Sequence, residues 1–266
     1  MIARWLPPGF KNGLDPDTTE GAIDLVYDAA ELPRRVCAVE PPGIPTAFWR
    51  SVGPSHNVFV TESFVDELAA AAKQDPVAYR LRPARQVAAR QGRARIWPRK
   101  RPAGDSRCPT GSGRGVSLSA RVRAAIMAQV AEVEVAKDGA VRVRRVVCAV
   151  DCGTVVNPDT VQAQIQSGII FGITAALYGE ITLKNGRVEQ TNFDSYQMLR
   201  MNEAPAIEVH IVQSAEPPGG MGEAGTSAIV PAVANAIFAA TGKRLRKMPV
   251  DPAALQAAGS EPNRPD

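Results

Sequence analysis

Hydrophobic and polar positions alternate most clearly in the middle of the chain. Residues 131–135 alternate alanine or valine with glutamate, and after the turn signal Asp138-Gly139 residues 141–144 alternate valine with arginine. A period of two residues is typical of half-buried strands, and a turn dipeptide between two such runs indicates a hairpin. We therefore predict a β-hairpin whose solvated face carries acidic and basic side chains.

Two further strand signals follow. Residues 180–184 and 187–191 flank Asn185-Gly186, a dipeptide that strongly favours a two-residue hairpin turn. Residues 205–212 alternate aliphatic side chains with polar ones, and His210 belongs to the polar set. We predict a second hairpin and then a half-exposed strand on which His210 points outward, without a metal role.

In three stretches, apolar residues recur with the period of a helix. The second begins at Asn157-Pro158, where asparagine caps the first turn and proline needs no N–H partner, and the third ends at Gly242, a residue common after helices. In the first helix we expect the apolar side chains at 58, 65, 68 and 72 to face the core. The helices are predicted over about residues 57–73, 158–177 and 229–240.

Two parts of the chain lack such periods. Residues 1–48 are rich in proline, glycine and aspartate and predict loops with brief extended pieces. Residues 80–123, the arginine-rich stretch, hold thirteen Lys or Arg against the single acid Asp105 and predict an irregular linker. An alternative is that a shifted reading frame was translated there. The resulting fold class is α+β, with mixed sheets and packed helices, divided into residues 1–79, the linker 80–123, residues 124–250 and a frayed tail 251–266.

Charge and composition narrow the classes of protein. The 266 residues are 45% hydrophobic and 22% charged, which is ordinary for a globular protein and excludes wholesale disorder. The net charge of +4 comes from the arginine-rich stretch, because the rest of the chain is acidic. A basic segment of this kind can bind nucleic acid or another polyanion, but Trp97 is its only aromatic residue and no recognised nucleic-acid-binding fold accompanies it. Nucleic-acid binding is therefore the less favoured alternative.

Neither a membrane span nor a disulfide framework is predicted. No apolar run approaches the roughly 18 to 20 residues that a span requires, and residues 1–8 lack the apolar region of a signal peptide. We expect a cytoplasmic location by default, with the periplasm open if a signal lies elsewhere in the complex. The cysteines at 37, 108, 148 and 152 contain no C-x-x-C pair. We expect buried structural thiols rather than half of a metal site at Cys148-x-x-x-Cys152, and we predict no metal ligands.

The strongest candidate for chemistry is the loop at residues 217–226. Its four glycines lie around one carboxylate, Glu223, just before the third helix. Glycine lets a backbone approach a ligand closely, and the N–H groups at a helix start favour anions. By composition alone the alternative is an ordinary strand-to-helix loop with a solvated glutamate.

The order of several motifs adds a family resemblance. The motifs resemble the C-terminal part of the molybdopterin-binding subunit of xanthine dehydrogenase and aldehyde oxidase family hydroxylases, with the bacterial isoquinoline 1-oxidoreductase branch nearest. The likeness covers about residues 12–81 and 112–250. The motifs are Phe48-Trp49-Arg50-Ser51-Val52-Gly53, Glu62 to Ala69, Val150-Asp151-Cys152-Gly153 through Asn157-Pro158, Gln164-x-x-x-Gly168, Pro217 to Glu223, and Pro231 to Ile237.

The resemblance implies a molybdenum cofactor, commonly molybdopterin cytosine dinucleotide in bacteria. It implies water-derived hydroxylation of an N-heteroaromatic compound or oxidation of an aldehyde, with electrons passing to iron–sulfur clusters on a small 2Fe–2S partner subunit. Glu223 then matches the catalytic base, and Arg50 matches an arginine near the metal that orients substrate. The residues assigned to cofactor binding are Gln164, Gly168, Gly220, Gly222 and Gly225.

Each of these assignments has a plainer alternative. Arg50 is otherwise an ordinary surface arginine, and Gln164 and Gly168 otherwise belong to a packed helix. Ala224 stands where the family commonly has proline, which is expected to loosen the loop that carries Glu223. The family's upstream glycine-rich loops are absent from this sequence. The alternative function is therefore a catalytically inactive remnant or an assembly module of such a complex.

Overall fold

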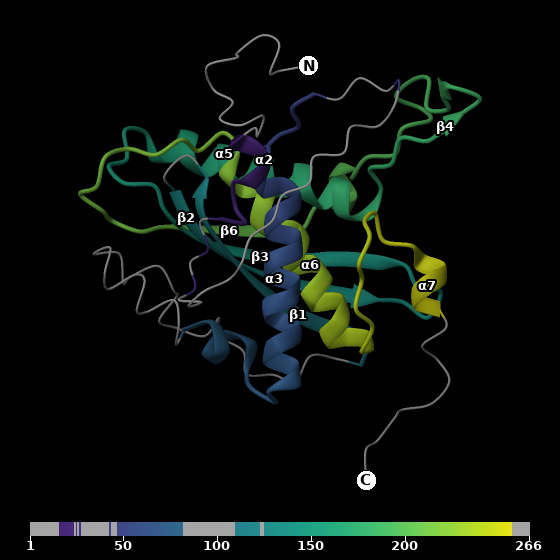
Figure 1. Ribbon diagram of the computed structural model, residues 1–266, viewed down its shortest axis with the longest axis horizontal. Helices are drawn as coiled ribbons and strands as arrows, with labels where there is room; N and C mark the ends of the chain where they lie inside the picture. The colour runs from purple at the N-terminus through teal and green to yellow at the C-terminus, as the bar shows by residue number, and fades with distance from the viewer. Residues whose placement is uncertain are drawn as a thin grey trace.

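The chain forms a mixed sheet with helices layered on one face (Figure 1). The computed structural model describes residues 16–23, 25, 27, 43, 47–81, 110–122 and 125–256. Helices and both antiparallel and parallel strand pairs contribute to one core. The α+β class predicted from the sequence is confirmed.

The main sheet has four strands in the order β1-β2-β3-β6. β1–β2 and β2–β3 pair antiparallel, whereas β6 runs parallel to β3. The predicted first hairpin is β2–β3, and the predicted second hairpin is the short pair β4–β5. The strands are β1 (Ser112–Val122), β2 (Ala125–Val135), β3 (Val141–Asp151), β4 (Leu183–Lys184), β5 (Arg187–Val188) and β6 (Ala206–Ile211).

The helix ends follow the sequence signals. The Asn157 side chain accepts a hydrogen bond from the Thr160 N–H and so caps α5, and Gly242 follows α6 with a φ of 74°. A short helix, α2, lies in the region where loops were expected. The helices are α2 (Pro16–Thr19), α3 (Pro54–Ala71), α5 (Pro158–Leu177), the 3₁₀ helix η2 (Met201–Glu203), α6 (Ala224–Thr241) and α7 (Pro252–Gln256).

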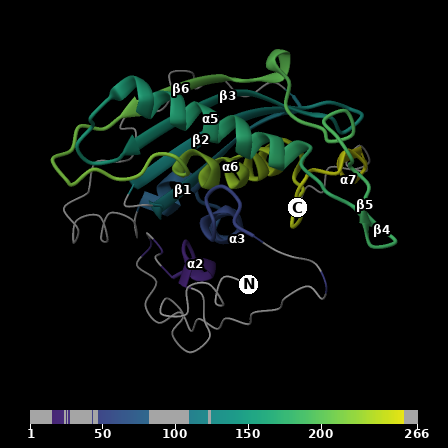
Figure 2. The same cartoon turned by 90° about the horizontal axis from the view of Figure 1, so that it is seen from above.

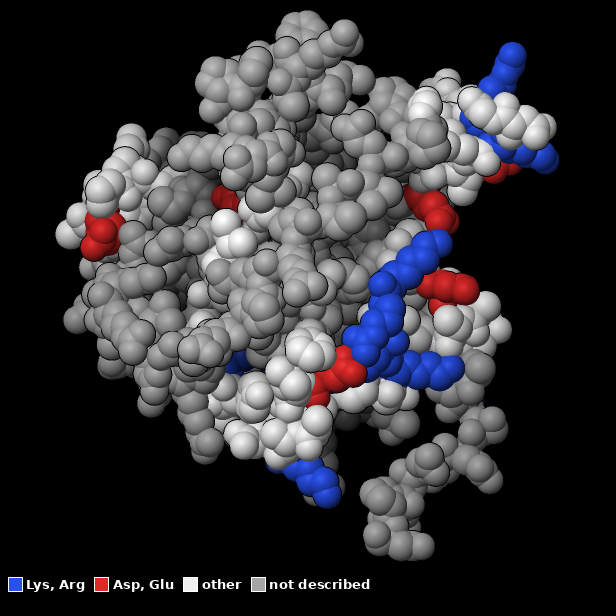
Figure 3. All heavy atoms as spheres, viewed as in Figure 1, with Lys and Arg blue, Asp and Glu red and all other residues white. Residues whose placement is uncertain are grey.

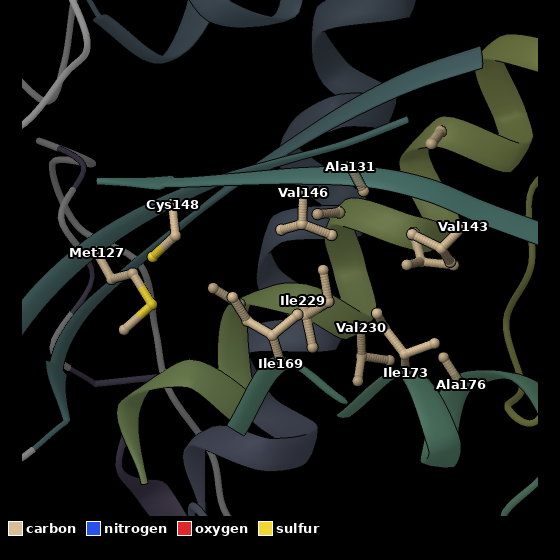
Figure 4. Close-up of a cluster of buried hydrophobic side chains, with 14 of the residues drawn as sticks. Met127, Ala131, Val143, Val146, Cys148, Ile169, Ile173, Ala176, Ile229 and Val230 are labelled. Atoms are coloured by element: carbon tan, nitrogen blue, oxygen red, sulfur yellow. The ribbon is translucent and has the colours of Figure 1, made fainter. Parts of the chain in front are cut away.

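The core lies between the sheet and two long helices. α6 packs on β1 and β2, α5 lies beside α6, and α3 packs against α6 and β1 (Figure 2). Aliphatic side chains from both helices meet the valines and alanines of β2 and β3 (Figure 4). The fully buried members include Ala131, Val146, Ile169, Ile173 and Ile229.

Strand β1 corrects the predicted extent of the linker. It occupies residues 112–122 of the arginine-rich stretch, whereas residues 82–109 of that stretch lie outside the described part. The small residues of β1 face α6: a Cβ on Gly113 or Gly115 would lie 2.1 Å from a carbonyl oxygen of that helix. The Ser117 hydroxyl donates to the α6 carbonyl of Ala228. The close contact with α6 therefore requires small side chains in β1. Because small residues do not alternate between hydrophobic and polar, the sequence pattern of a strand is absent there.

Helix α3 is confirmed, but the face predicted to be buried is wrong. Of the expected apolar positions Val58 is buried, whereas Leu68 is 39% exposed. The buried face carries the carboxylates Glu62 and Asp66 instead, because Arg80 supplies their counter-charge. Arg80 is fully buried, and its guanidinium lies 2.9 Å from Glu62 Oε2 and 3.3 Å from Asp66 Oδ1.

Helix α6 exceeds the apolar length expected from the sequence. Its 18 residues have the length and composition of a membrane span, but 78% of that window is buried inside the protein. The basic residues after it pair with acids: Arg246 lies 2.7 Å from Glu67, and Lys247 lies 3.2 Å from Glu180. On the face shown in Figure 3, basic and acidic side chains likewise lie side by side. These contacts are typical of a core helix whose end is fastened to its neighbours.

Candidate functional site

The glycine-rich loop connects β6 to α6 and places Glu223 immediately before the helix. Glu223 is half-buried, Met221 before it is buried, and Gly222 between them is exposed. A Cβ built on Gly222 would meet nothing within 4 Å. The carboxylate therefore lies at a helix start, beside a stretch of backbone that is open to a ligand.

Arg50 joins this loop to helix α5. Its Nε donates to the Gly222 carbonyl at 2.7 Å, while Nη1 donates to the Ser167 hydroxyl at 3.0 Å and Nη2 to Gln164 Oε1 at 3.3 Å. The structure thus brings together Arg50, Gln164 and the loop that carries Glu223, although they lie far apart in the sequence.

The turn that presents Arg50 is strained and braced by aromatic packing. Ser51 and Val52, the next two residues, have positive φ values of 82° and 46°. Such conformations cost free energy in residues other than glycine and cluster at functional sites. Trp49 packs on Phe171 of α5 with ring centroids 4.8 Å apart, and the Arg50 guanidinium carbon lies 5.7 Å from the centre of the Phe171 ring. The turn is therefore fixed against α5 by apolar as well as polar contacts.

Two of the glycines assigned to the cofactor have a packing role. A Cβ on Gly168 would lie 3.0 Å from Gly225 Cα, and a Cβ on Gly225 would lie 2.7 Å from the Ile165 carbonyl oxygen. Both glycines are buried between α5 and α6. The structure therefore places Gly168 and Gly225 against each other at the helix crossing, as the packed-helix alternative expects, while Gly220 and Gly222 remain exposed.

A pocket opens where the start of α5 meets the loop after β6. Its volume is about 310 Å³, and Gln164 is the one lining residue that was assigned to cofactor binding from the sequence. Asn157 is identified from the sequence as a helix cap, and Asn157 and Thr154 belong to a family motif, but the sequence assigns no cofactor contact to these residues or to Thr160. The lining residues are Cys152, Thr154, Val155, Val156, Asn157, Thr160, Val161, Gln164, Pro218, Gly219 and Met221.

Sequence reasoning also missed Gln129. This side chain is fully buried on the α6 side of β2, and its Nε2 donates to the Gly225 carbonyl at 3.1 Å and contacts Met127 Sδ at 2.9 Å. A buried amide is costly unless it is hydrogen-bonded, so its presence in an apolar strand indicates a specific partner. The available signal was one polar residue inside the otherwise apolar run of residues 125–131.

The cysteines of the described region are structural. Cys148 and Cys152 are buried free thiols, and burial raises the pKa of Cys148 to about 12 and also raises that of Cys152. Among the described residues there is no cluster of three or more His, Cys, Asp or Glu side chains that could hold a metal ion.

Comparisons with known proteins indicate one family. Residues 84–205, a range that begins inside the arginine-rich stretch, match a molybdopterin cofactor-binding domain family. The chain is 33% identical over 270 residues to the beta subunit of isoquinoline 1-oxidoreductase from Brevundimonas diminuta, covering 98% of this chain and 34% of that protein. It is 35% identical over 242 residues to a subunit of nicotinate dehydrogenase from Pseudomonas putida, covering 85% of this chain and 20% of that protein.

A solved structure shares the fold. The aldehyde oxidoreductase from Desulfovibrio gigas superposes with a TM-score of 0.63 over 79% of this chain and 41% of that chain, at 14% identity. The chain spans about a third or less of the length of the isoquinoline 1-oxidoreductase and nicotinate dehydrogenase subunits that it matches. The chain belongs to the molybdopterin-binding subunits of the xanthine dehydrogenase and aldehyde oxidase family.

Proposed function

We propose that the chain forms the part of a molybdenum hydroxylase large subunit that carries the catalytic base. The reaction is water-derived hydroxylation of an N-heteroaromatic compound or oxidation of an aldehyde. The observation that carries the proposal is the Arg50 guanidinium, which bonds both Gln164 of α5 and the Gly222 carbonyl beside Glu223. Arg50, Gln164 and the loop that carries Glu223, which come from separate family motifs, thus lie together.

The residues present fit one part of a pterin cofactor. Hydroxyl and amide side chains of Thr154, Asn157, Thr160 and Gln164 line the pocket, and they offer both donors and acceptors to a pterin ring. The pocket volume of about 310 Å³ lies at the lower end for ligand sites, so it takes part of a dinucleotide cofactor such as molybdopterin cytosine dinucleotide.

Glu223 acts as the base in this proposal. When bound, the molybdenum cofactor supplies the redox chemistry of oxygen insertion. Glu223 accepts the proton released in that reaction, because a carboxylate whose backbone is held at the start of α6 can present its oxygen in one orientation. Its half-buried position limits water access without removing it from the site.

Arg50 contributes charge and orientation beside Glu223. Its three bonds to described residues use three of the five N–H donors of a guanidinium, and among those residues the other two have no acceptor and can serve a substrate or a developing negative charge. The described cysteines are two buried thiols, fewer than an iron–sulfur cluster needs. In the proposed complex, electrons pass to a separate 2Fe–2S subunit, as the family resemblance implies.

The test is Glu223→Gln in the complete molybdenum-loaded complex. Loss of the base is expected to lower kcat by about 10² to 10⁴-fold while molybdenum content stays unchanged, because amide and carboxylate have the same shape. Glu189→Gln, an exposed carboxylate on the β5 side of the second hairpin, is the matched control and should keep full turnover. Full turnover of the Glu223 variant would refute the assignment.

A second candidate is an assembly module without activity. The small volume of the pocket supports it, because the described residues enclose too little space for a whole dinucleotide cofactor. An active complex whose turnover depends on Glu223 would exclude this alternative. The polyanion-binding alternative rests on residues of the arginine-rich stretch that lie mainly outside the described part of the chain.

A further inference from the structure

We propose that Arg50 and Gln129 are positioning residues for Glu223, which hold the backbone on both sides of this carboxylate and so fix its direction. The inference rests on the proposed function, in which Glu223 is the base. Gly222 directly precedes Glu223, and Gly225 follows it by two residues. The carbonyls of these two glycines accept the bonds from Arg50 and Gln129.

The Arg50 contact ties the start of the loop to α5. The bond from Nε to the Gly222 carbonyl is 2.7 Å long, and the same guanidinium is anchored by Ser167 and Gln164. Because a guanidinium is planar, three bonds in one fork fix its orientation as well as its place. The position of Gly222 is therefore set by α5 through Arg50.

The Gln129 contact ties the end of the loop to the sheet. Gln129 is fully buried, and its Nε2 lies 3.1 Å from the Gly225 carbonyl oxygen. Placing an amide in this apolar layer costs free energy that an aliphatic side chain would avoid, so the bond to Gly225 is the feature that the residue provides. Gln129 is not among the residues that line the pocket, and its effect on chemistry must be indirect.

The segment needs external support because of its own composition. Glycines on both sides of Glu223-Ala224 give the backbone more accessible conformations than other residues would. The rigid proline common in the family at position 224 is replaced by alanine, so the chain itself restrains the loop less. Two hydrogen bonds, one from the α5 side and one from β2, add to the packing of Gly225 against α5 and restrain this segment.

The main test is Gln129→Met in the complete molybdenum-loaded complex. Methionine keeps the length and apolar contacts but removes the donor. We expect kcat to fall by about 10²-fold with little change in KM, as for a catalytic group displaced by about 1 Å. Amide hydrogen exchange at residues 222–226 should become faster. Ser117→Ala is the matched control, since it removes a bond to the Ala228 carbonyl in the same helix–sheet interface, and it should leave kcat and this exchange unchanged.

A second variant keeps the test decisive if Gln129→Met fails to fold. Arg50→Lys keeps the charge but loses the planar fork, and it should lower kcat and speed exchange at residues 222–226. Unchanged exchange and kcat in the Gln129 variant, or a raised KM with unchanged exchange in the Arg50 variant, would overturn the positioning role. Full turnover of Glu223→Gln would instead refute the proposed function, while the exchange data would still decide whether the two side chains hold the loop.

Discussion

Replacing Arg80 by methionine should destabilise the fold by removing the centre of a buried charge cluster. Arg80 is fully buried, and its guanidinium donates to the Glu62 carboxylate at 2.9 Å, the Glu62 carbonyl at 2.9 Å and Asp66 at 3.3 Å. Removing one partner of a buried ion pair typically costs about 3 to 5 kcal/mol, because an uncompensated charge remains. Methionine preserves most of the apolar contacts, so the charge effect dominates the outcome.

The remaining contacts place the loss at the lower end of that range. Glu62 keeps hydrogen bonds from the Tyr27 hydroxyl and the Leu118 N–H, and Asp66 keeps Arg244 at 2.7 Å. We therefore expect the free energy of unfolding to fall by about 3 kcal/mol. With an m-value of about 3 kcal/mol per molar, the urea midpoint should fall by about 1 M.

The assay is equilibrium urea unfolding followed by circular dichroism, with Arg144→Met as the control. Arg144 forms an ion pair with Glu134 in which both side chains are about half exposed, so its loss should cost less than about 1 kcal/mol. A loss in the Arg80 variant no larger than that of the control would refute the reasoning that the buried cluster holds α3 to the sheet.

Three further predictions concern the fold. Burial of the Tyr27 hydroxyl and the nearby Glu62 carboxylate raise the pKa of Tyr27 well above 10.0. The free energy of unfolding should therefore stay constant below about pH 10 and fall above it, where the unfolded chain releases this proton more readily. Urea midpoints from about pH 9 to about pH 11 should show this fall, and Tyr27→Phe should make it smaller. Burial raises the pKa of Cys148 to about 12, so with the other three cysteines replaced by serine this thiol should react with Ellman's reagent at about pH 8 only after unfolding, and rapid native labelling would contradict its burial. Gly168→Ala should lower the free energy of unfolding by about 1 to 3 kcal/mol, because the added Cβ would lie 3.0 Å from Gly225 Cα. An unchanged urea midpoint would show that α5 and α6 can move apart without loss of stability.

Elements with local signals were predictable from the sequence. The β2–β3 hairpin follows from strict alternation around Asp138-Gly139, and α5 follows from its asparagine cap and apolar period. The strand before the glycine-rich loop was predicted for the same reason, and His210 is exposed on it as expected. Next to Asp138-Gly139, in α5 and in β6, the more buried and the more exposed positions alternate, so the hydrophobic pattern records the structure there directly.

The errors share a different physical cause, which is packing between distant segments. β1 was missed because Gly113, Gly115 and Ser117 are small to admit α6, and small residues carry no hydrophobic period. The buried face of α3 was misassigned because the burial of Glu62 depends on Arg80, a partner that lies beyond the helix. A local sequence pattern cannot show that a distant helix packs closely on a strand, or that a distant residue supplies a counter-charge.

The candidate site shows the same division. Glu223, Arg50 and Gln164 were found through motif order, and the structure brings the residues around them into contact. Gln129 was missed because its role depends on a carbonyl 96 residues further along the chain. Family motifs therefore indicated the candidate site, whereas the hydrogen bonds between its segments could be seen only in the fold.

The most direct measurement is the molybdenum and pterin content of the chain, purified from a host that makes the cofactor. Molybdenum is measured by elemental analysis, and pterin by fluorescence after oxidation. We predict that both are bound in equal amounts and that Gln164→Leu, which removes an amide from the pocket wall, lowers both together. Absence of metal and pterin from the unaltered chain would contradict a cofactor-binding role and favour the inactive assembly module.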